Sequence, residues 1–223
     1  MARVVLFGIG QVSETLTVYL ERESDHEIVG YTVDAAFRDG KTQFMGKPVF
    51  DWETLETHFA PDQGVVFGPL SYRGMNQLRR ERYEEGKARG YDFLTFIHPA
   101  SHVYTDQIGE NCLILEANTI QPFAKIGNNV MIWSGNHIGH HTHVGDHCFV
   151  STHVAIAGSC RIGPSCFFAG KSGVADNVTV GEGCLIGAGA SVLSDLEAGS
   201  FARESATHVV PKAAQRFGKL LLS

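Results

Sequence analysis

The chain has 223 residues, enough for one large domain or two small ones, and a formal net charge of −6. That acidic balance argues against a nucleic-acid-binding protein, because such proteins usually present a basic surface. No apolar run resembles a signal peptide or reaches the roughly 20 residues of a membrane span, so we expect a cytoplasmic protein without membrane insertion.

Residues 1–98 alternate short apolar strands with helical segments. The expected strands are residues 3–7, 27–33, 64–68 and 92–98. The expected helices are residues 11–22, 52–58 and 74–89. This alternation predicts a Rossmann-like α/β domain with a small parallel sheet, whose ligands bind at the carboxyl ends of the strands.

Glycine and polar residues follow two of these strands. Gly8 and Gly10 follow the first strand, but Ser13 stands where the dinucleotide fingerprint requires a third glycine. The two glycines either permit only a tight turn, or let Gln11 and the start of the helix receive a phosphate or a sugar hydroxyl. Asp34 either accepts a hydrogen bond from a ribose or base, or serves as a turn residue.

From Ile108 to Val192 every sixth residue, fifteen in succession, is a branched aliphatic or Phe. This period is typical of hexapeptide repeats, in which the chain coils in flat sides with one inward aliphatic on each, and it predicts a parallel β-helix. A glycine often follows the aliphatic, as expected at a corner with unusual backbone angles. A second inward position, from Cys112 to Ala190, holds all five cysteines, which we expect to be buried and reduced.

The predicted domains are therefore the α/β domain at residues 1–98, the β-helix at 99–198 and a C-terminal cap at 199–223. Pro99 marks the first boundary, and the loss of the six-residue period after Val192 marks the second. A short basic helix is expected at residues 212–222 of the cap.

Six histidines are concentrated in residues 137–153. They are His137, His140, His141, His143, His147 and His153. Zinc would need three or four converging ligands, whereas a general base needs one imidazole with an orienting partner. No two of the six are separated by the eighteen residues of a three-sided coil, so a zinc site would have to form between subunits. Most of the six, His147 among them, are expected to be solvated.

The string from Trp133 to His141 (WSGNHIGHH), continuing with GDHCFVS at 145–151, resembles the sugar O-/N-acyltransferase family. That family includes sialic acid O-acetyltransferases and UDP-amino-sugar and GDP-perosamine N-acetyltransferases. The similarity extends over the FGIG start, the PVF…W segment and the FIHP junction. It implies a left-handed β-helix and a homotrimer, with acetyl-CoA in a groove between subunits and a nucleotide-linked sugar on the N-terminal domain.

The resemblance also implies roles for individual residues. It places the general base at His140, and it leaves His141 where many members have an acid. His141 then orients the base, or a carboxylate from Asp146 or Glu116 does so. The remaining implied contacts are Gly158, Gly170 and Lys171 for acetyl-CoA, with the Gly158 amide receiving the thioester oxygen, and Gly8, Gly10, Gln11, Asp34, Asn136 and His137 for the sugar nucleotide. Gln11 replaces a histidine common in the family.

The resulting prediction is an acetyl-CoA-dependent acetyltransferase that acts on a nucleotide-linked amino or deoxy sugar for surface polysaccharide, with no metal. Its acceptor attacks the thioester directly while His140 takes the proton, because imidazole ionises near neutral pH. Two alternatives remain: a trimeric β-helix zinc enzyme of the carbonic anhydrase type, and a sugar-nucleotide-binding protein without catalysis.

Overall fold

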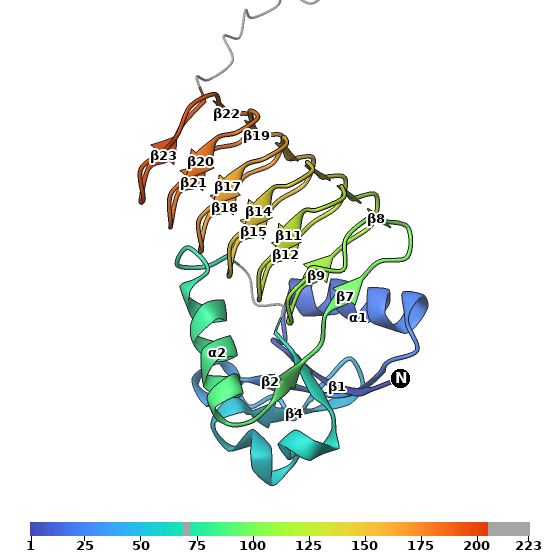
Figure 1. Ribbon diagram of the computed structural model, residues 1–223. Coiled ribbons are helices and arrows are strands. Elements are labelled where there is room, and N and C mark those ends of the chain that lie inside the picture. Colours follow the sequence, from blue (N-terminus) through green and yellow to red (C-terminus); the bar gives the residue numbers. More distant parts are fainter. Residues whose placement is uncertain (69–71, 205–223) are drawn as a thin grey trace, which may run out of the picture.

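The computed structural model describes residues 1–68 and 72–204, which form an α/β domain and a parallel β-helix stacked on it (Figure 1). The expected basic helix at 212–222 lies outside the described residues.

The α/β domain contains a six-stranded sheet in the order β3-β4-β2-β1-β5-β6, in which only β3 and β4 are antiparallel. The strands are β1 (Arg3–Phe7), β2 (Glu27–Val33), β3 (Gln43–Phe44), β4 (Lys47–Asp51), β5 (Val65–Phe67) and β6 (Asp92–Phe93). The helices are α1 (Gln11–Glu23) and α2 (Gln77–Ala88), with 3₁₀ segments at Ala35–Phe37, Trp52–Thr57 and Pro61–Gln63. The helix expected at 52–58 is thus a 3₁₀ segment, and the one expected at 74–89 begins at Gln77.

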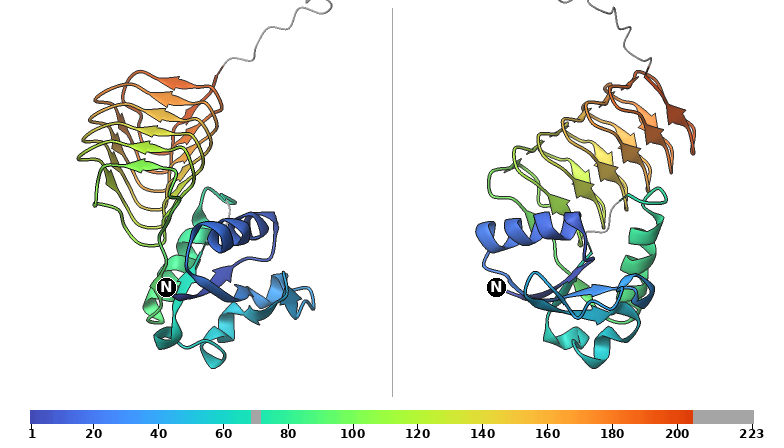
Figure 2. Two further views of the ribbon diagram at one scale, coloured as in Figure 1. Left: turned by 90° about the vertical axis from the view of Figure 1, so that its right-hand side faces the viewer. Right: turned by 180° about the vertical axis from the view of Figure 1, so that it is seen from behind.

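The β-helix has three flat faces, each a parallel sheet of two-residue strands (Figure 2). The face that packs on the α/β domain is called the docked face. It contains β7 (Phe96–Ile97), β9 (Leu113–Ile114), β12 (Met131–Ile132), β15 (Phe149–Val150), β18 (Phe167–Phe168), β21 (Leu185–Ile186) and β23 (Phe201–Ala202). The His137 face contains β8 (His102–Val103), β10 (Thr119–Ile120), β13 (His137–Ile138), β16 (Ala155–Ile156), β19 (Gly173–Val174) and β22 (Ser191–Val192). The Lys125 face contains β11 (Lys125–Ile126), β14 (His143–Val144), β17 (Arg161–Ile162) and β20 (Thr179–Val180).

The strand expected at 92–98 is split between the two domains. β6 ends the α/β sheet, whereas β7 already pairs with β9 of the docked face. At the other end, β23 pairs with β21, so the stack reaches Ala202. The β-helix therefore starts before the expected boundary at residue 98 and continues past residue 198.

The six-residue period predicted the core of the β-helix correctly. Fourteen of the fifteen aliphatic or Phe positions are buried, and the remaining one, Ile108, is half-buried against them. Every second inward position is also buried, including the five cysteines, all of which are free thiols. Burial raises the pKa of the Cys112 thiol to about 12, so this group stays protonated.

The expectation for the glycines that follow the inward aliphatics was wrong. Positive φ occurs two residues later, for example 58° at His141, 63° at His147 and 57° at His153. The glycines are required instead because the coils lie close together. A Cβ on Gly139, for instance, would lie 2.5 Å from the carbonyl carbon of Ala157 in the next coil.

Each of the three corners of the coil bears at least one of the clustered histidines. The His140 corner joins the His137 and Lys125 faces, the His147 corner joins the Lys125 and docked faces, and the His153 corner joins the docked and His137 faces. The docked face packs on the α/β domain through a shared apolar cluster that includes Leu16 and Met131. The His140 corner therefore lies opposite the face on which the α/β domain sits.

Candidate functional site

Two adjacent imidazoles project from the His140 corner, directly after β13. The Nδ1 atoms of His140 and His141 are 3.1 Å apart, and both side chains are exposed. The His140 backbone N–H donates to Oε1 of Gln121 at 2.9 Å. The ring of His141 packs against Phe123, with centroids 4.7 Å apart. When Nδ1 of His140 donates to Nδ1 of His141, the neutral His140 has an unprotonated Nε2 that is free to accept a proton.

Gly158 lies one coil beyond His140, as the eighteen-residue spacing predicts. A Cβ on Gly158 would lie 2.7 Å from Cε1 and 2.9 Å from Nε2 of His140, so the imidazole in this position packs directly against the glycine. The Gly158 N–H donates to Oδ1 of Asp176, again one coil further on, at 2.9 Å. An imidazole and a glycine are therefore adjacent at this corner, and the N–H of that glycine is hydrogen-bonded to a carboxylate.

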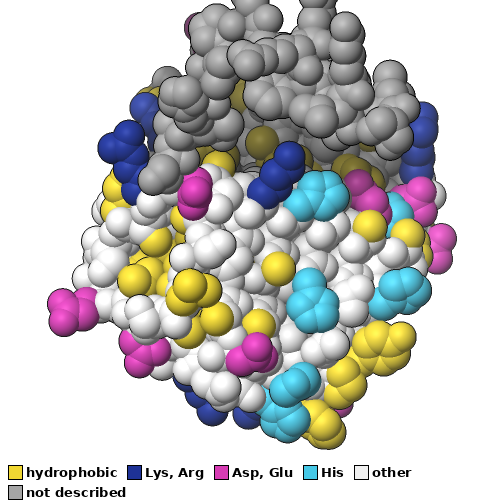
Figure 3. Space-filling model, turned by 90° about the horizontal axis from the view of Figure 1, so that it is seen from above, with side chains coloured by type: hydrophobic (Ala, Val, Ile, Leu, Met, Phe, Trp, Pro, Cys, Tyr) yellow, Lys and Arg dark blue, Asp and Glu magenta, His cyan; other side chains and the backbone are white. Residues whose placement is uncertain are grey.

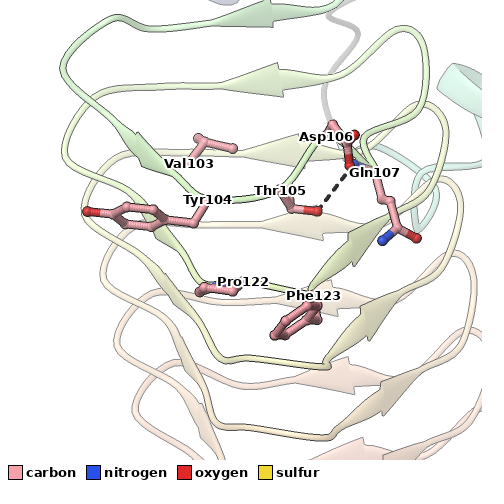
Figure 4. A pocket seen from close by; sticks show the side chains of 7 residues that line it. All are labelled: Val103, Tyr104, Thr105, Asp106, Gln107, Pro122 and Phe123. Atoms are coloured by element: carbon pink, nitrogen blue, oxygen red, sulfur yellow. Dashed lines mark hydrogen bonds between the residues drawn. The ribbon is translucent and has the colours of Figure 1, made fainter.

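Two adjoining hollows lie beside the histidine pair and share Pro122 and Phe123. The first, about 380 Å³, is completed by Gln121, His140 and His141. The second, about 480 Å³, is completed by residues 103–107 (Figure 4). The rings of Tyr104 and Phe123 border it and are each 63% exposed. Exposed aromatic rings beside polar groups are suited to bind a sugar ring or the nucleobase of a nucleotide.

Exposed histidines gather on one side of the β-helix (Figure 3). Five of the six in the cluster are exposed: His137, His140, His141, His143 and His153. The sixth, His147, was expected to be solvated and is instead 7% exposed beneath α2. That expectation was wrong because the α/β domain covers this corner.

Polar side chains connect His147 to the α/β domain. Nδ1 of His147 lies 2.9 Å from Nδ2 of Asn129, and Nδ2 of Asn111 donates to Oδ1 of Asn129 at 2.9 Å. Asn111 in turn accepts a hydrogen bond from the Gly68 N–H after β5. Arg79 of α2 is fully buried and donates to the carbonyls of Asn129 and His147. The polar groups of this corner are therefore used in joining the domains.

Burial affects the ionisation of both charged groups at this corner. It lowers the pKa of Arg79 from 12.5 to about 10, so the guanidinium remains charged at neutral pH. It also lowers the pKa of His147, and the nearby Arg80 and Arg79 act in the same direction, whereas Asp146 and Glu84 oppose them. His147 is therefore held as a neutral imidazole.

Of the residues predicted to act on acetyl-CoA, the structure brings together His140, His141 and Gly158. Gly170 and Lys171 lie at the His153 corner, on the opposite edge of the His137 face. His137 projects outward from β13 between the two corners and is exposed. Within one chain, the expected acetyl-CoA residues are therefore divided between two corners.

Asn136, expected among the substrate contacts, points into the coil instead and is 3% exposed. Its Nδ2 donates to the Trp133 carbonyl, and its Oδ1 accepts the Val154 N–H at 2.7 Å. Its amide is therefore engaged by the backbone, as its second inward position dictates, and cannot reach a substrate.

The other expected substrate residues lie at the carboxyl ends of the strands of the α/β sheet. Gly8 follows β1, and Gly10 immediately precedes Gln11, the exposed first residue of α1. Asp34 follows β2, and its Oδ1 accepts a hydrogen bond from Nε of Arg82 at 2.6 Å. Beside this ion pair a groove of about 330 Å³ includes Phe37 and Arg73. The carboxylate of Asp34 is therefore already paired on one oxygen.

Among residues 1–68 and 72–204, no three His, Cys, Asp or Glu side chains converge as metal ligands would. A zinc site built from these described residues alone would thus need ligands from more than one chain. In the same ranges, no helix combines the length and the apolar character needed to span a membrane.

The comparisons with known proteins concern the fold. No curated protein matches the chain significantly in sequence. The family described as bacterial transferase hexapeptide (six repeats) matches residues 123–158, which include both His140 and Gly158. The chain carries the hexapeptide repeat.

Solved structures share the whole two-domain fold. The perosamine N-acetyltransferase of Caulobacter crescentus, in complex with CoA and GDP-perosamine, is 23% identical, with a TM-score of 0.74 over 89% of this chain and 92% of that one. The acetyltransferase domain of PglB from Neisseria gonorrhoeae, in complex with acetyl coenzyme A, is 22% identical, with a TM-score of 0.74 over 89% and 94%. WeeI from Acinetobacter baumannii is 15% identical, with a TM-score of 0.55 over 84% and 94%. These likenesses show an α/β domain followed by a left-handed hexapeptide β-helix, the fold that the sequence predicted.

Sequence reasoning proposed Glu116 and Asp146 as carboxylates for the base, and the structure places neither beside it. Glu116 accepts a hydrogen bond from Ser134 at the His153 corner, and Asp146 caps the Asn128 N–H at the His147 corner. The acid that bonds the Gly158 amide, one coil beyond His140, is Asp176, which sequence reasoning missed. The hexapeptide spacing would have found it, because it lies eighteen residues after Gly158. The same spacing places Phe123 eighteen residues before His141.

Proposed function

We propose that the chain is an acyltransferase that transfers the acetyl group of acetyl-CoA to an amine or hydroxyl of a nucleotide-linked amino or deoxy sugar. The observation that carries this proposal is the imidazole of His140 lying against Gly158 on a hexapeptide coil. The similar folds of two acetyltransferases, solved with CoA, acetyl coenzyme A or GDP-perosamine, support it. A cytoplasmic role in surface polysaccharide synthesis fits this chemistry.

In the proposed mechanism, Nε2 of His140 takes the proton of the acceptor while the acceptor attacks the thioester carbonyl carbon. His141 accepts a hydrogen bond from Nδ1 of His140 and stabilises the imidazolium that forms. The Gly158 N–H stabilises the oxyanion of the tetrahedral intermediate. The C–S bond then breaks, and CoA leaves as a thiolate that takes the proton from His140. No thiol of the protein takes part, since all five are buried.

The two substrates would approach His140 from opposite directions. Acetyl-CoA lies along the later coils, past Gly158, with Gly170 and Lys171 supplied by the His153 corner of a neighbouring chain. The acceptor sugar lies in the two adjoining hollows, one of which is drawn in Figure 4, over the exposed rings of Phe123 and Tyr104.

A homotrimer would bring the separated parts together. The α/β domain sits on the docked face, opposite the His140 corner, so Gly8, Gln11 and Asp34 belong to a different side of the chain from His140. We expect light scattering to give the mass of a trimer at micromolar concentration, with C3 symmetry. A monomer at that concentration contradicts the proposal.

The direct test is a panel of UDP-, dTDP- and GDP-linked amino and deoxy sugars with acetyl-CoA, in which thiol release is followed over time. We expect sustained thiol release with at least one sugar nucleotide, and mass spectrometry should find that acceptor heavier by one acetyl group. Binding of sugar nucleotides without any acetyl transfer would instead support a non-catalytic binding protein.

A further inference from the structure

One hydrogen bond at the His140 corner competes with the chemistry proposed for it. The Gly158 N–H that would stabilise the oxyanion already donates to Oδ1 of Asp176 at 2.9 Å. A Cβ on Gly158 would lie 2.9 Å from Nε2 of His140 and 3.2 Å from that carboxylate oxygen. The imidazole, the Gly158 N–H and the carboxylate therefore meet at Gly158, and the reacting carbonyl would have to bind at their edge.

The same kind of hydrogen bond, in which a side chain caps a backbone N–H, occurs at the His147 corner, where no catalytic role is proposed for the amide. There the Asn128 N–H donates to Oδ1 of Asp146 at 2.7 Å, and the Glu110 N–H donates to Oδ1 of Asn128 at 3.0 Å. In each case an Asp or Asn caps the amide of the residue eighteen positions earlier. Capping is therefore a general feature of these coils, and only the Asp176 cap covers an amide beside the proposed base.

We propose that Asp176 is an internal ligand of the acyl site, which the thioester oxygen must displace from the Gly158 amide before acetyl transfer. This proposal rests on the proposed function. A single N–H cannot serve both acceptors fully, and a carboxylate left beside the developing oxyanion would oppose its negative charge. The Asp176 side chain is exposed, so it can turn into water when the thioester arrives.

The internal ligand discriminates between acetyl-CoA and CoA. Both contain the same nucleotide and pantetheine groups, but only acetyl-CoA carries the oxygen that competes with Asp176. The carboxylate thus weakens the binding of acetyl-CoA relative to CoA. After transfer, the return of Asp176 to the amide favours dissociation of the acetylated product, whose new carbonyl oxygen would occupy the same place.

The test measures the dissociation constants of acetyl-CoA and CoA by calorimetry for the full-length wild type, Asp176→Ala and Asp176→Asn. We expect Asp176→Ala to bind acetyl-CoA about five- to tenfold more tightly, because the thioester oxygen no longer has to displace an exposed, charged hydrogen bond from the Gly158 amide. The affinity for CoA should change less than about twofold, because CoA carries no acyl oxygen that competes for this amide. Asp176→Asn keeps an acceptor without the charge and should give an intermediate ratio.

Asp146→Ala is the matched control, because it removes the equivalent cap at the His147 corner. It should leave the ratio of the two dissociation constants at the wild-type value. An unchanged ratio in Asp176→Ala overturns the proposal that Asp176 is an internal ligand and leaves the proposed function intact. If the alanine variant does not fold, an unchanged ratio in Asp176→Asn has the same meaning. Failure of the wild type to bind either CoA compound overturns both.

Discussion

The His140 and His147 corners have the same local structure and different surroundings. His141 and His147 occupy equivalent places in successive hexapeptides, with φ of 58° and 63°. At the first corner both imidazoles are exposed beside two hollows, whereas at the second α2 covers the ring and Arg79 fills the space around it. The six-residue pattern determines where a histidine stands on the coil, but what packs over the corner determines whether it can meet a substrate.

The largest difference between the corners should appear in catalysis. His140→Ala should lower kcat by about 10²- to 10⁴-fold, the usual contribution of a general base, while thermal stability and CoA binding stay near wild type. His143→Ala, an exposed histidine on the Lys125 face, is the control and should keep full kcat. Full kcat in His140→Ala would remove the functional distinction between the corners.

The next largest effect should appear in folding, at the His147 corner. Arg79→Met leaves the carbonyls of Asn129 and His147 without their donor, so we expect a loss of about 3 kcal/mol in the free energy of unfolding. Urea denaturation measures it. Arg80→Met removes a neighbouring arginine with a surface ion pair and should cost less than about 0.5 kcal/mol. Equal losses in the two variants would contradict the role given to Arg79.

Acid should weaken the His147 corner before it affects the coil. Burial lowers the pKa of His147, so the unfolded chain binds this proton more readily than the folded one. Its contribution to stability is complete above the ordinary histidine pKa of about 6.5 and declines as the pH falls through that value towards the folded pKa. Denaturation midpoints from pH 7.5 to 5 should therefore fall less steeply in His147→Gln than in the wild type. Parallel curves would show that His147 does not titrate on unfolding.

The smallest effect concerns the partner of the base. His141→Ala removes the hydrogen bond to His140 and should lower kcat about two- to tenfold, the value of one ordinary hydrogen bond. His141→Glu, which restores the acid of the resembling family, should keep kcat at or above wild type. If alanine and glutamate have equal effects, His141 does not orient His140.

The repeating part of the molecule could be predicted from sequence because its contacts recur every eighteen residues. That rule placed the inward aliphatics, the five cysteines and the pair of His140 with Gly158 correctly. It could not show that Arg79 would bury His147, because that contact joins residues 68 positions apart in two domains. The sequence also suggested unusual backbone angles as the reason for glycines such as Gly139, whereas the structure shows close packing between coils.

The regular hydrogen bonding between coils also limits how this chain can change in length. Adding one residue between Gly158 and Asp176 would rotate every later side chain off its corner, so a core aliphatic would face solvent. Adding eighteen would keep the interior intact while moving Asp176 one coil further from Gly158 and placing a new residue on its amide. Evolution can therefore exchange the neighbours of the acyl site in whole-turn steps, and partial turns are excluded by the core.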